Sequence, residues 1–318
     1  MRQKLFLPRL IWACSFNGKT SVSKTEVPRS SRGGPANNSF MGVKLSKKEA
    51  LEFTGQDKKF FDNYLGACEF SCLERNNGRG RFYFDQDVLK SWMKEREWRT
   101  VQLTLENYAL CLDFALAQHF RSYVTSDFGT GRQREFGQKI TNWVKGQLGE
   151  LAVQKFLKDK FNVEVELDFD LHDDIVPQDI IRVKEKGKIR NPKIGVGIKS
   201  SKPKNVFLVL GENEIKIAVR RSDVYIFCRP DIPDDHILRI AKNAVQKIVQ
   251  GMPYYKSYKE HMPEFTSIPC EVVGWCRYTD LEEVREIPGQ TFDGVRFVKA
   301  SGKLNNTPKD WEKLARMI

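Results

Sequence analysis

The chain has 318 residues, of which 40% are hydrophobic and 30% are charged, a composition typical of a folded globular protein rather than a disordered or fibrous one. No apolar run reaches the roughly 18 to 20 residues that a membrane-spanning helix requires. The formal net charge of +12 favours a polyanionic partner, although basic residues also form ordinary solvated surfaces.

Residues 1–42 are predicted to be a disordered basic tail. The segment is rich in Ser, Arg, Gly and Asn, and such a composition cannot build an apolar core. Its apolar stretch is interrupted by Pro8 and Arg9, which argues against a secretory signal. We expect a plain tail, or a segment upstream of a natural start at Met41. An organelle-targeting segment and a DNA-contacting arm are the alternatives.

Residues 43–99 are predicted to form a separate small module. Ser46 and Glu49 have the spacing of a capping box, which predicts a helix from there to Gly55. The pattern then predicts a second helix, two short extended runs around a turn, and a third helix. Their expected ranges are 58–67 for the second helix, 70–73 and 81–84 for the extended runs, 76–80 for the turn and 88–97 for the third helix.

This order of elements resembles a winged helix-turn-helix of the excisionase or MerR type. The ending of the module, Phe84-Asp85-Gln86-Asp87-Val88-Leu89-Lys90-Ser91-Trp92, is similar to the closing strand and helix of that family. The resemblance implies that four basic residues approach DNA: Lys58 and Lys59 near the second helix, and Arg79 and Arg81 in the wing. A protein-interaction or structural subdomain is the alternative.

Residues 100–318 are predicted to form an α/β (α+β) domain, with a mixed sheet flanked by helices. Helices are expected at 102–124, 134–160, 212–220 and 236–250, with a short amphipathic helix near 310–314. Strands are expected at 163–170, 179–185, 193–200, 206–210, 223–229 and 270–278.

The long predicted helix carries a carboxylate among apolar neighbours. Trp143, Gln147, Glu150 and Gln154 fall on one helical face, and Gly146 and Gly149 allow another backbone to approach closely. A buried carboxylate is costly unless it is paired or bound to a metal. Glu150 is therefore a candidate metal ligand. The alternatives are a position at the solvent edge or an ion pair with Lys145.

Two predicted strands add a second carboxylate and a lysine. Asp179 opens one strand after Pro177 and Gln178. In the other, alternation places Val196 and Ile198 on one face and Gly195, Gly197 and Lys199 on the opposite face. Glycines before the lysine are expected to leave room for a ligand or a metal. The alternative is an ordinary capping Asp with a surface Lys.

The helix with Glu150, the strand that starts at Asp179 and the strand that ends at Lys199 together resemble the PD-(D/E)XK nucleases, most closely type II restriction endonucleases. The resemblance implies catalytic roles for Glu150, Asp179 and Lys199. The middle acidic position of the motif falls on Gly197, which cannot bind a metal. Glu150 then supplies the second carboxylate, or the site is weakened or inactive. Asp173 and Asp174 are rival carboxylates.

The resemblance also implies the cofactor and the DNA contacts. Mg²⁺ prefers oxygen ligands and is expected on Glu150, Asp179, the Ile198 carbonyl and Asp174, with Gln147 as an auxiliary ligand. Lys199 is expected to orient or deprotonate the attacking water, or to stabilise charge in the transition state. Four further residues are expected to contact the DNA backbone: Arg132, Arg134, Ser201 and Lys202.

The expected function is site-specific, Mg²⁺-dependent hydrolysis of phosphodiester bonds in double-stranded DNA. A homodimer and a cognate DNA methyltransferase are the expected partners, and the expected location is cytoplasmic. A non-catalytic DNA-binding regulator or pseudonuclease is the first alternative. A repair or junction-resolving nuclease is the second.

Overall fold

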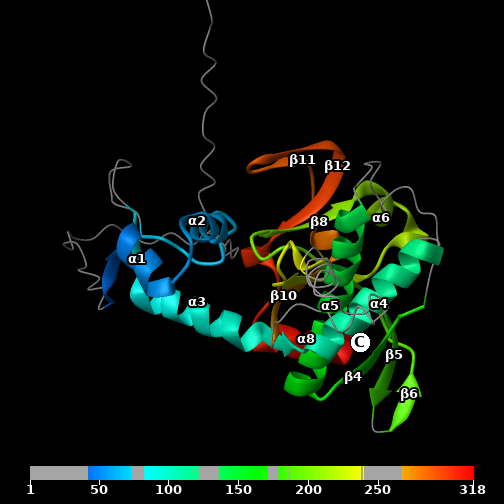
Figure 1. The fold of residues 1–318 in the computed structure, drawn as a ribbon. Helices are drawn as coiled ribbons and strands as arrows, with labels where there is room; N and C mark the ends of the chain where they lie inside the picture. Colours follow the sequence, from blue (N-terminus) through cyan, green and yellow to red (C-terminus); the bar gives the residue numbers. More distant parts are fainter. Residues whose placement is uncertain are drawn as a thin grey trace, which may run out of the picture. The chain divides into compact units, whose positions relative to one another are not determined.

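The computed structural model describes residues 42–73, 82–121, 136–170, 178–185, 187–237, 239 and 267–318. It has a mixed α+β architecture (Figure 1). The chain divides into two compact units, Met1–Lys90 and Ser91–Ile318, and the boundary falls within helix α3 (Gln86–Arg99). The predicted tail at 1–42 lies outside the described residues except for Gly42, and so do the whole predicted turn at 76–80 and most of the predicted helix 236–250.

In the first unit, the strands β1 (Lys44–Ser46) and β2 (Tyr83–Asp85) pair antiparallel, and the helices α1 (Lys47–Thr54) and α2 (Lys58–Gly66) lie between them in the sequence. The predicted capping box at Ser46 is present, and Gly55 ends α1 with a left-handed φ of 63°. The rings of Phe61, Phe70 and Phe84 pack edge-on or tilted against one another and form the core. The first two predicted helices are confirmed. The predicted hairpin of 70–73 with 81–84 is wrong, because β1 is the strand that pairs with β2, and residues 70–73 contribute only an isolated bridge from Leu73 to Tyr83.

The second unit contains a four-stranded mixed sheet. Its strand order is β3 (Thr100–Leu103), β10 (Ile268–Arg277), β9 (Val224–Pro230) and β7 (Val196–Ser200). β7 and β9 are parallel, and the other pairs are antiparallel. The prediction of a helix from residue 102 is wrong at its start. Val101 and Leu103 turn inward as strand residues beside β10, and helix α4 (Leu105–Arg121) begins only afterwards.

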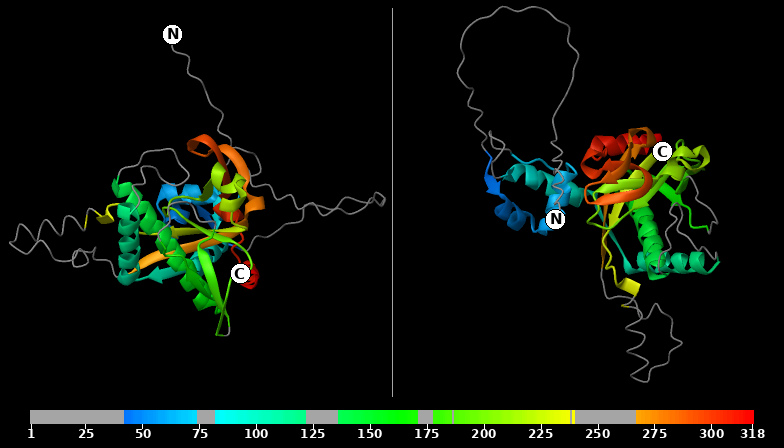
Figure 2. Two further views of the ribbon diagram at one scale, coloured as in Figure 1. Left: turned by 90° about the vertical axis from the view of Figure 1, so that its right-hand side faces the viewer. Right: turned by 90° about the horizontal axis from the view of Figure 1, so that it is seen from above.

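The helix α5 (Phe136–Phe161) crosses one face of this sheet, and α4 packs beside it (Figures 1 and 2). Its buried face includes Val144, Leu148 and Phe156, which belong to the same core cluster as Ile198 and Ile226 of the sheet. An added side-chain carbon at Gly149 would collide with Ser200 and Cys228, so this glycine permits the close approach of α5 to β7. Gly146 has open space at the same point, so it does not share that role.

Two three-stranded antiparallel sheets complete the unit. One contains β4 (Glu164–Leu167), β5 (Ile180–Glu185) and β6 (Lys188–Arg190), and the other contains β8 (Phe207–Gly211), β12 (Gln290–Ala300) and β11 (Glu282–Ile287). The sequence did not predict β6 or the β11–β12 hairpin, because charged residues dominate β6 and β11. Where one helix was expected at 212–220, the short helix α6 (Glu212–Lys216) is followed by a 3₁₀ turn at Ala218–Arg220.

The chain's last helix, α8 (Pro308–Met317), begins with a capping box between Thr307 and Asp310 and buries Trp311 and Leu314. The amphipathic helix predicted near 310–314 is therefore confirmed and is longer than expected. Among the described residues, every helix is too short or too polar to cross a membrane.

Candidate functional site

Asp179 lies where two sheets of the second unit meet. Its backbone N–H donates to the Val196 carbonyl at 2.9 Å, and its carbonyl accepts from the N–H of Asp168 at 3.2 Å. The Ile198 N–H donates to Oδ2 of the Asp179 carboxylate at 2.5 Å. These bonds hold the carboxylate between the end of β4 and the middle of β7.

Lys199 extends from β7 to a carboxylate that the sequence did not single out. Its Nζ lies 2.8 Å from Oε1 of Glu214 on α6, and the two side chains are 33% and 15% exposed. Strand β8 and the start of α6 separate these residues in the chain, so no local spacing rule joins them. The one sequence feature that points to Glu214 is its position in the first acidic turn after a strand.

Glu150 lies on the buried side of α5, as its apolar neighbours predicted. It is 7% exposed, and its Oε1 accepts from Nε2 of Gln147 at 3.1 Å. The Oε1 atom of Gln147 is buried and accepts no hydrogen bond. The alternative pairing of Glu150 with Lys145 does not occur, because Lys145 pairs with Asp234 at 2.9 Å.

The charges of these groups act on one another. Burial, and then the repulsion of Asp179, raise the pKa of Glu150 well above its ordinary value, and Lys199 partly opposes them. Burial also raises the pKa of Asp179, against the opposing effects of Lys199 and of the Ile198 N–H. Burial alone would lower the pKa of Lys199, but Glu214 and Asp179 raise it instead. In this arrangement Lys199 is a charged ammonium group and not a free base.

A third carboxylate near this group comes from Asp168, which raises the pKa of both Glu150 and Asp179. Asp168 follows β4, in the same connection as the rival residues Asp173 and Asp174. Those two residues lie outside the described residues, as do Arg79, Arg81, Arg132 and Arg134. Lys58 and Lys59 are exposed at the start of α2 in the first unit.

Gly197, at the motif position of the missing acid, has no room for a side chain. An added carbon would lie 2.7 Å from Ser222 Oγ and 2.9 Å from two ring atoms of Tyr225. The expectation that this glycine leaves space for a ligand is therefore wrong, because Ser222 and Tyr225 fill that space. Any second carboxylate must come from another element of the fold.

We expect Gly197→Ala to lower the free energy of unfolding by about 1–3 kcal/mol, because overpacking forces neighbouring groups out of place. Gly195→Ala is the matched control, since an added carbon there meets nothing nearer than Asp223 at 3.5 Å. Urea titration of both variants measures the difference. Equal losses in the two variants would contradict the crowding at Gly197.

Whether Glu150, Asp179 and their neighbours could hold a hard cation depends on the oxygen atoms that they offer. Within the described ranges, no three side chains of His, Cys, Asp or Glu are grouped as a ready metal site. Two observations fit a divalent ion nonetheless. The buried Gln147 Oε1 lacks a donor, and the charge of Asp179 raises the pKa of the buried Glu150, a repulsion that a bound cation would relieve.

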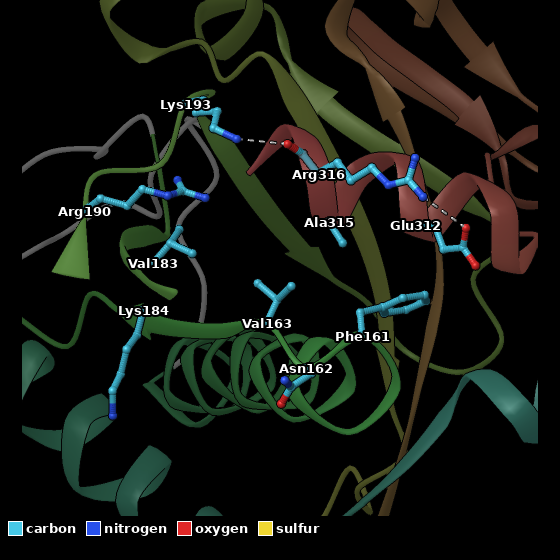
Figure 3. A pocket seen from close by; sticks show the side chains of 10 residues that line it. All are labelled: Phe161, Asn162, Val163, Val183, Lys184, Arg190, Lys193, Glu312, Ala315 and Arg316. Atoms are coloured by element: carbon cyan, nitrogen blue, oxygen red, sulfur yellow. Dashed lines mark hydrogen bonds and ion pairs between the residues drawn. The ribbon is translucent and has the colours of Figure 1, made fainter. Parts of the chain in front are cut away.

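A pocket of about 530 Å³ lies at the other end of α5, against β5, β6 and α8 (Figure 3). Four of its lining side chains are basic, and neighbouring groups already engage them. Lys193 Nζ donates to the Arg316 carbonyl at 3.2 Å, and Arg316 lies 3.8 Å from Glu312. Arg190 donates to the Ile318 carbonyl oxygen at 2.8 Å, and Lys184 pairs with Glu164 at 3.4 Å. The candidate site is therefore the carboxylate–lysine group and not this pocket.

Comparison of the chain with models of protein families, with curated proteins and with solved structures finds no match.

Proposed function

We propose that this chain is a Mg²⁺-dependent endonuclease that hydrolyses phosphodiester bonds of double-stranded DNA, of the PD-(D/E)XK type. The observation that carries the proposal is the placement of two charged groups at β7: the Ile198 N–H donates to the Asp179 carboxylate at 2.5 Å, and the next residue, Lys199, pairs with Glu214 at 2.8 Å. Both Asp179 and Lys199 act on the pKa of the buried Glu150 of α5. Their order along the chain and their elements match the motif that the sequence resembles. Glu214 adds the acidic group beside Lys199 that Gly197 cannot provide.

The roles of the chain's own residues follow from their charges. Asp179, oriented by the Ile198 N–H, and Glu150 present oxygen atoms to the site. The ammonium group of Lys199 stabilises the negative charge that develops on the phosphate during hydrolysis. Glu214 keeps Lys199 protonated and fixes its position, because the two groups form a close ion pair. Lys199 therefore acts as an electrostatic stabiliser rather than as the general base.

Mg²⁺ would be held by Glu150 and Asp179, with the Ile198 carbonyl and Gln147 Oε1 as neutral oxygen ligands. When bound, it supplies a polarised phosphoryl oxygen and a water of lowered pKa. The expected metal role of Asp174 stays a prediction, since that residue is outside the described part of the chain.

The first experiment incubates the protein with a long duplex DNA in the presence and absence of Mg²⁺. Discrete fragments that appear only with Mg²⁺ support a restriction-type endonuclease. Nicks confined to junctions or mismatches favour a repair nuclease, and DNA binding without cleavage favours a regulator. No cleavage of any DNA across a range of Mg²⁺ concentrations would contradict the proposal.

Glu214→Gln is expected to slow cleavage by roughly tenfold to a hundredfold, because Lys199 loses the partner that holds its position. Glu212→Gln, two residues earlier on α6, is the matched control and should cleave normally, because Glu212 is half-buried like Glu214 but pairs with Lys216 at 2.7 Å instead of Lys199. Single-turnover rates at saturating DNA separate this effect from weakened binding. A rate for Glu214→Gln equal to that of Glu212→Gln would contradict a role for Glu214 in the site.

The winged helix-turn-helix assignment of the first unit remains part of this proposal. The exposed Lys58 and Lys59 at the start of α2, and the antiparallel bridge between Leu73 and Tyr83 at the base of the expected wing, support it. A homodimer would match the two-fold symmetry of a palindromic site. Sedimentation of the protein with and without a palindromic duplex tests this expectation.

A further inference from the structure

A second charged cluster lies beside the candidate site. Asp234, which follows β9, accepts two hydrogen bonds from lysines of different elements. Lys145 Nζ on α5 lies 2.9 Å from its Oδ1, and Lys202 Nζ lies 2.7 Å from its Oδ2. The two ammonium groups therefore contact the same carboxylate, each at a different oxygen atom.

The burial of the three partners is uneven. The side chain of Lys145 is only 5% exposed, whereas that of Asp234 is 61% exposed. A buried ammonium group requires an anionic partner, and here the partner is a carboxylate at the surface. Hydrogen bonds from Lys202 and Lys145 lower the pKa of Asp234 to about 2, so this carboxylate is ionised at neutral pH.

Both lysines of this cluster lie close to residues of the proposed catalytic site. Ser200 directly follows Lys199, and Gly146 directly follows Lys145. The Ser200 hydroxyl donates to the Gly146 carbonyl at 3.5 Å, so the two segments are in contact at this point. Lys202 follows Lys199 by three residues. An anion held by the two lysines therefore lies near the site without occupying it.

We infer that Lys145 and Lys202 form a binding site for a backbone phosphate of the nucleic acid substrate, and that Asp234 occupies this site in the free protein. This inference rests on the proposed function and adds a substrate contact to it. A phosphate offers compact anionic oxygens like those of a carboxylate. Because Asp234 is exposed, an arriving phosphate can replace it while Lys145 keeps an anionic partner.

The test compares Asp234→Asn with Asp235→Asn, which changes the net charge equally at the next residue. Asp235 is exposed and pairs with Arg239 at 2.9 Å, away from the two lysines. Affinity for a duplex DNA is measured without Mg²⁺ over a range of NaCl concentrations. Asp234→Asn is expected to bind roughly fivefold to tenfold more tightly than Asp235→Asn, with a salt slope steeper by about one. Equal or weaker binding by Asp234→Asn overturns the inference.

A second measurement separates the anion site from the nuclease proposal. Melting temperatures are recorded in sulfate and in chloride at equal ionic strength. Sulfate is expected to raise the melting temperature of Asp234→Asn more than that of Asp235→Asn. When Lys202→Gln is combined with Asp234→Asn, this additional rise should disappear. That result supports the anion site even where no DNA is cleaved. Equal sulfate responses in the two aspartate variants overturn it.

Asp234→Asn leaves Lys145 without its carboxylate partner, and that variant can fail to fold for this reason alone. Lys202→Gln in the otherwise unchanged chain then serves as the second test, with the exposed Lys204→Gln as its control. Weaker DNA binding by Lys202→Gln than by Lys204→Gln supports the phosphate site. Equal binding by the two lysine variants overturns it.

Discussion

Replacement of Asp179 by Asn is expected to reduce Mg²⁺-dependent DNA cleavage by about a hundredfold to a thousandfold while DNA binding persists. The amide keeps the shape of the side chain, and its oxygen can still accept the hydrogen bond from the Ile198 N–H. It lacks the negative charge that acts on Lys199 and that the proposed cation would require. The strand ends should therefore stay in place while the chemistry is lost.

Glu166→Gln is the matched control for Asp179→Asn, because Glu166 is an exposed carboxylate on the adjoining strand β4, paired with Arg182 at 3.6 Å. Cleavage rates and DNA affinities of both variants are measured in parallel, together with their melting temperatures. Full cleavage by Asp179→Asn would remove this residue from the site. An equal loss in both variants would indicate a general charge effect instead.

Replacement of Glu271 by Gln is expected to lower the free energy of unfolding of the second unit by about 3–5 kcal/mol, since it leaves buried cations without their counter-charge. Glu271 on β10 is 5% exposed. Its carboxylate lies 3.1 Å from Arg96, 3.4 Å from Arg99 and 3.8 Å from Arg229. One carboxylate thus links α3 to the two central strands of the mixed sheet.

The pH dependence of stability provides a second measurement on Glu271. Burial would raise the pKa of this carboxyl, but Arg229, Arg96 and Arg99 lower it from 4.5 to about 2. Because the folded-state pKa is depressed, the stabilisation is present above pH 4.5 and is lost as the pH falls towards 2. Glu271→Gln should lack this acid-dependent loss. Urea titrations between pH 2 and pH 7, with Glu282→Gln as the exposed control, test both the magnitude and the pH dependence.

The local structure of much of this chain was predictable from short stretches of sequence. The capping boxes at Ser46 and Thr307 set the starts of α1 and α8, because these motifs depend only on residues within one helical turn. The apolar periodicity around Glu150 predicted both α5 and the burial of its carboxylate. The start of α4 was misjudged because Val101 and Leu103 suit a helix face as well as a strand, and only pairing with β10 decides between them.

Some residues of the candidate site could be identified from their local sequence, and others could not. Glu150, Asp179 and Lys199 were identifiable from the sequence because each has an unusual local setting: a carboxylate on an apolar helix, or a charge at the end of an apolar strand. The contributions of Asp168 and Glu214, and of Asp234 in the neighbouring lysine cluster, were not identifiable. Each is an ordinary acid in its own segment: Glu214 and Asp234 gain their lysine partners, and Asp168 comes near Asp179, only where separate segments meet.

Short stretches of sequence were enough for most of the helices and for the burial of Glu150, since both follow from neighbours a few residues apart, but they were not enough for β3, β6 or the β11–β12 hairpin. The tertiary fold was needed to show that Tyr225 and Ser222 fill the space beside Gly197, and that Glu214 pairs with Lys199. Those pairings depend on sheet order and register, which bring together residues that no local interaction connects.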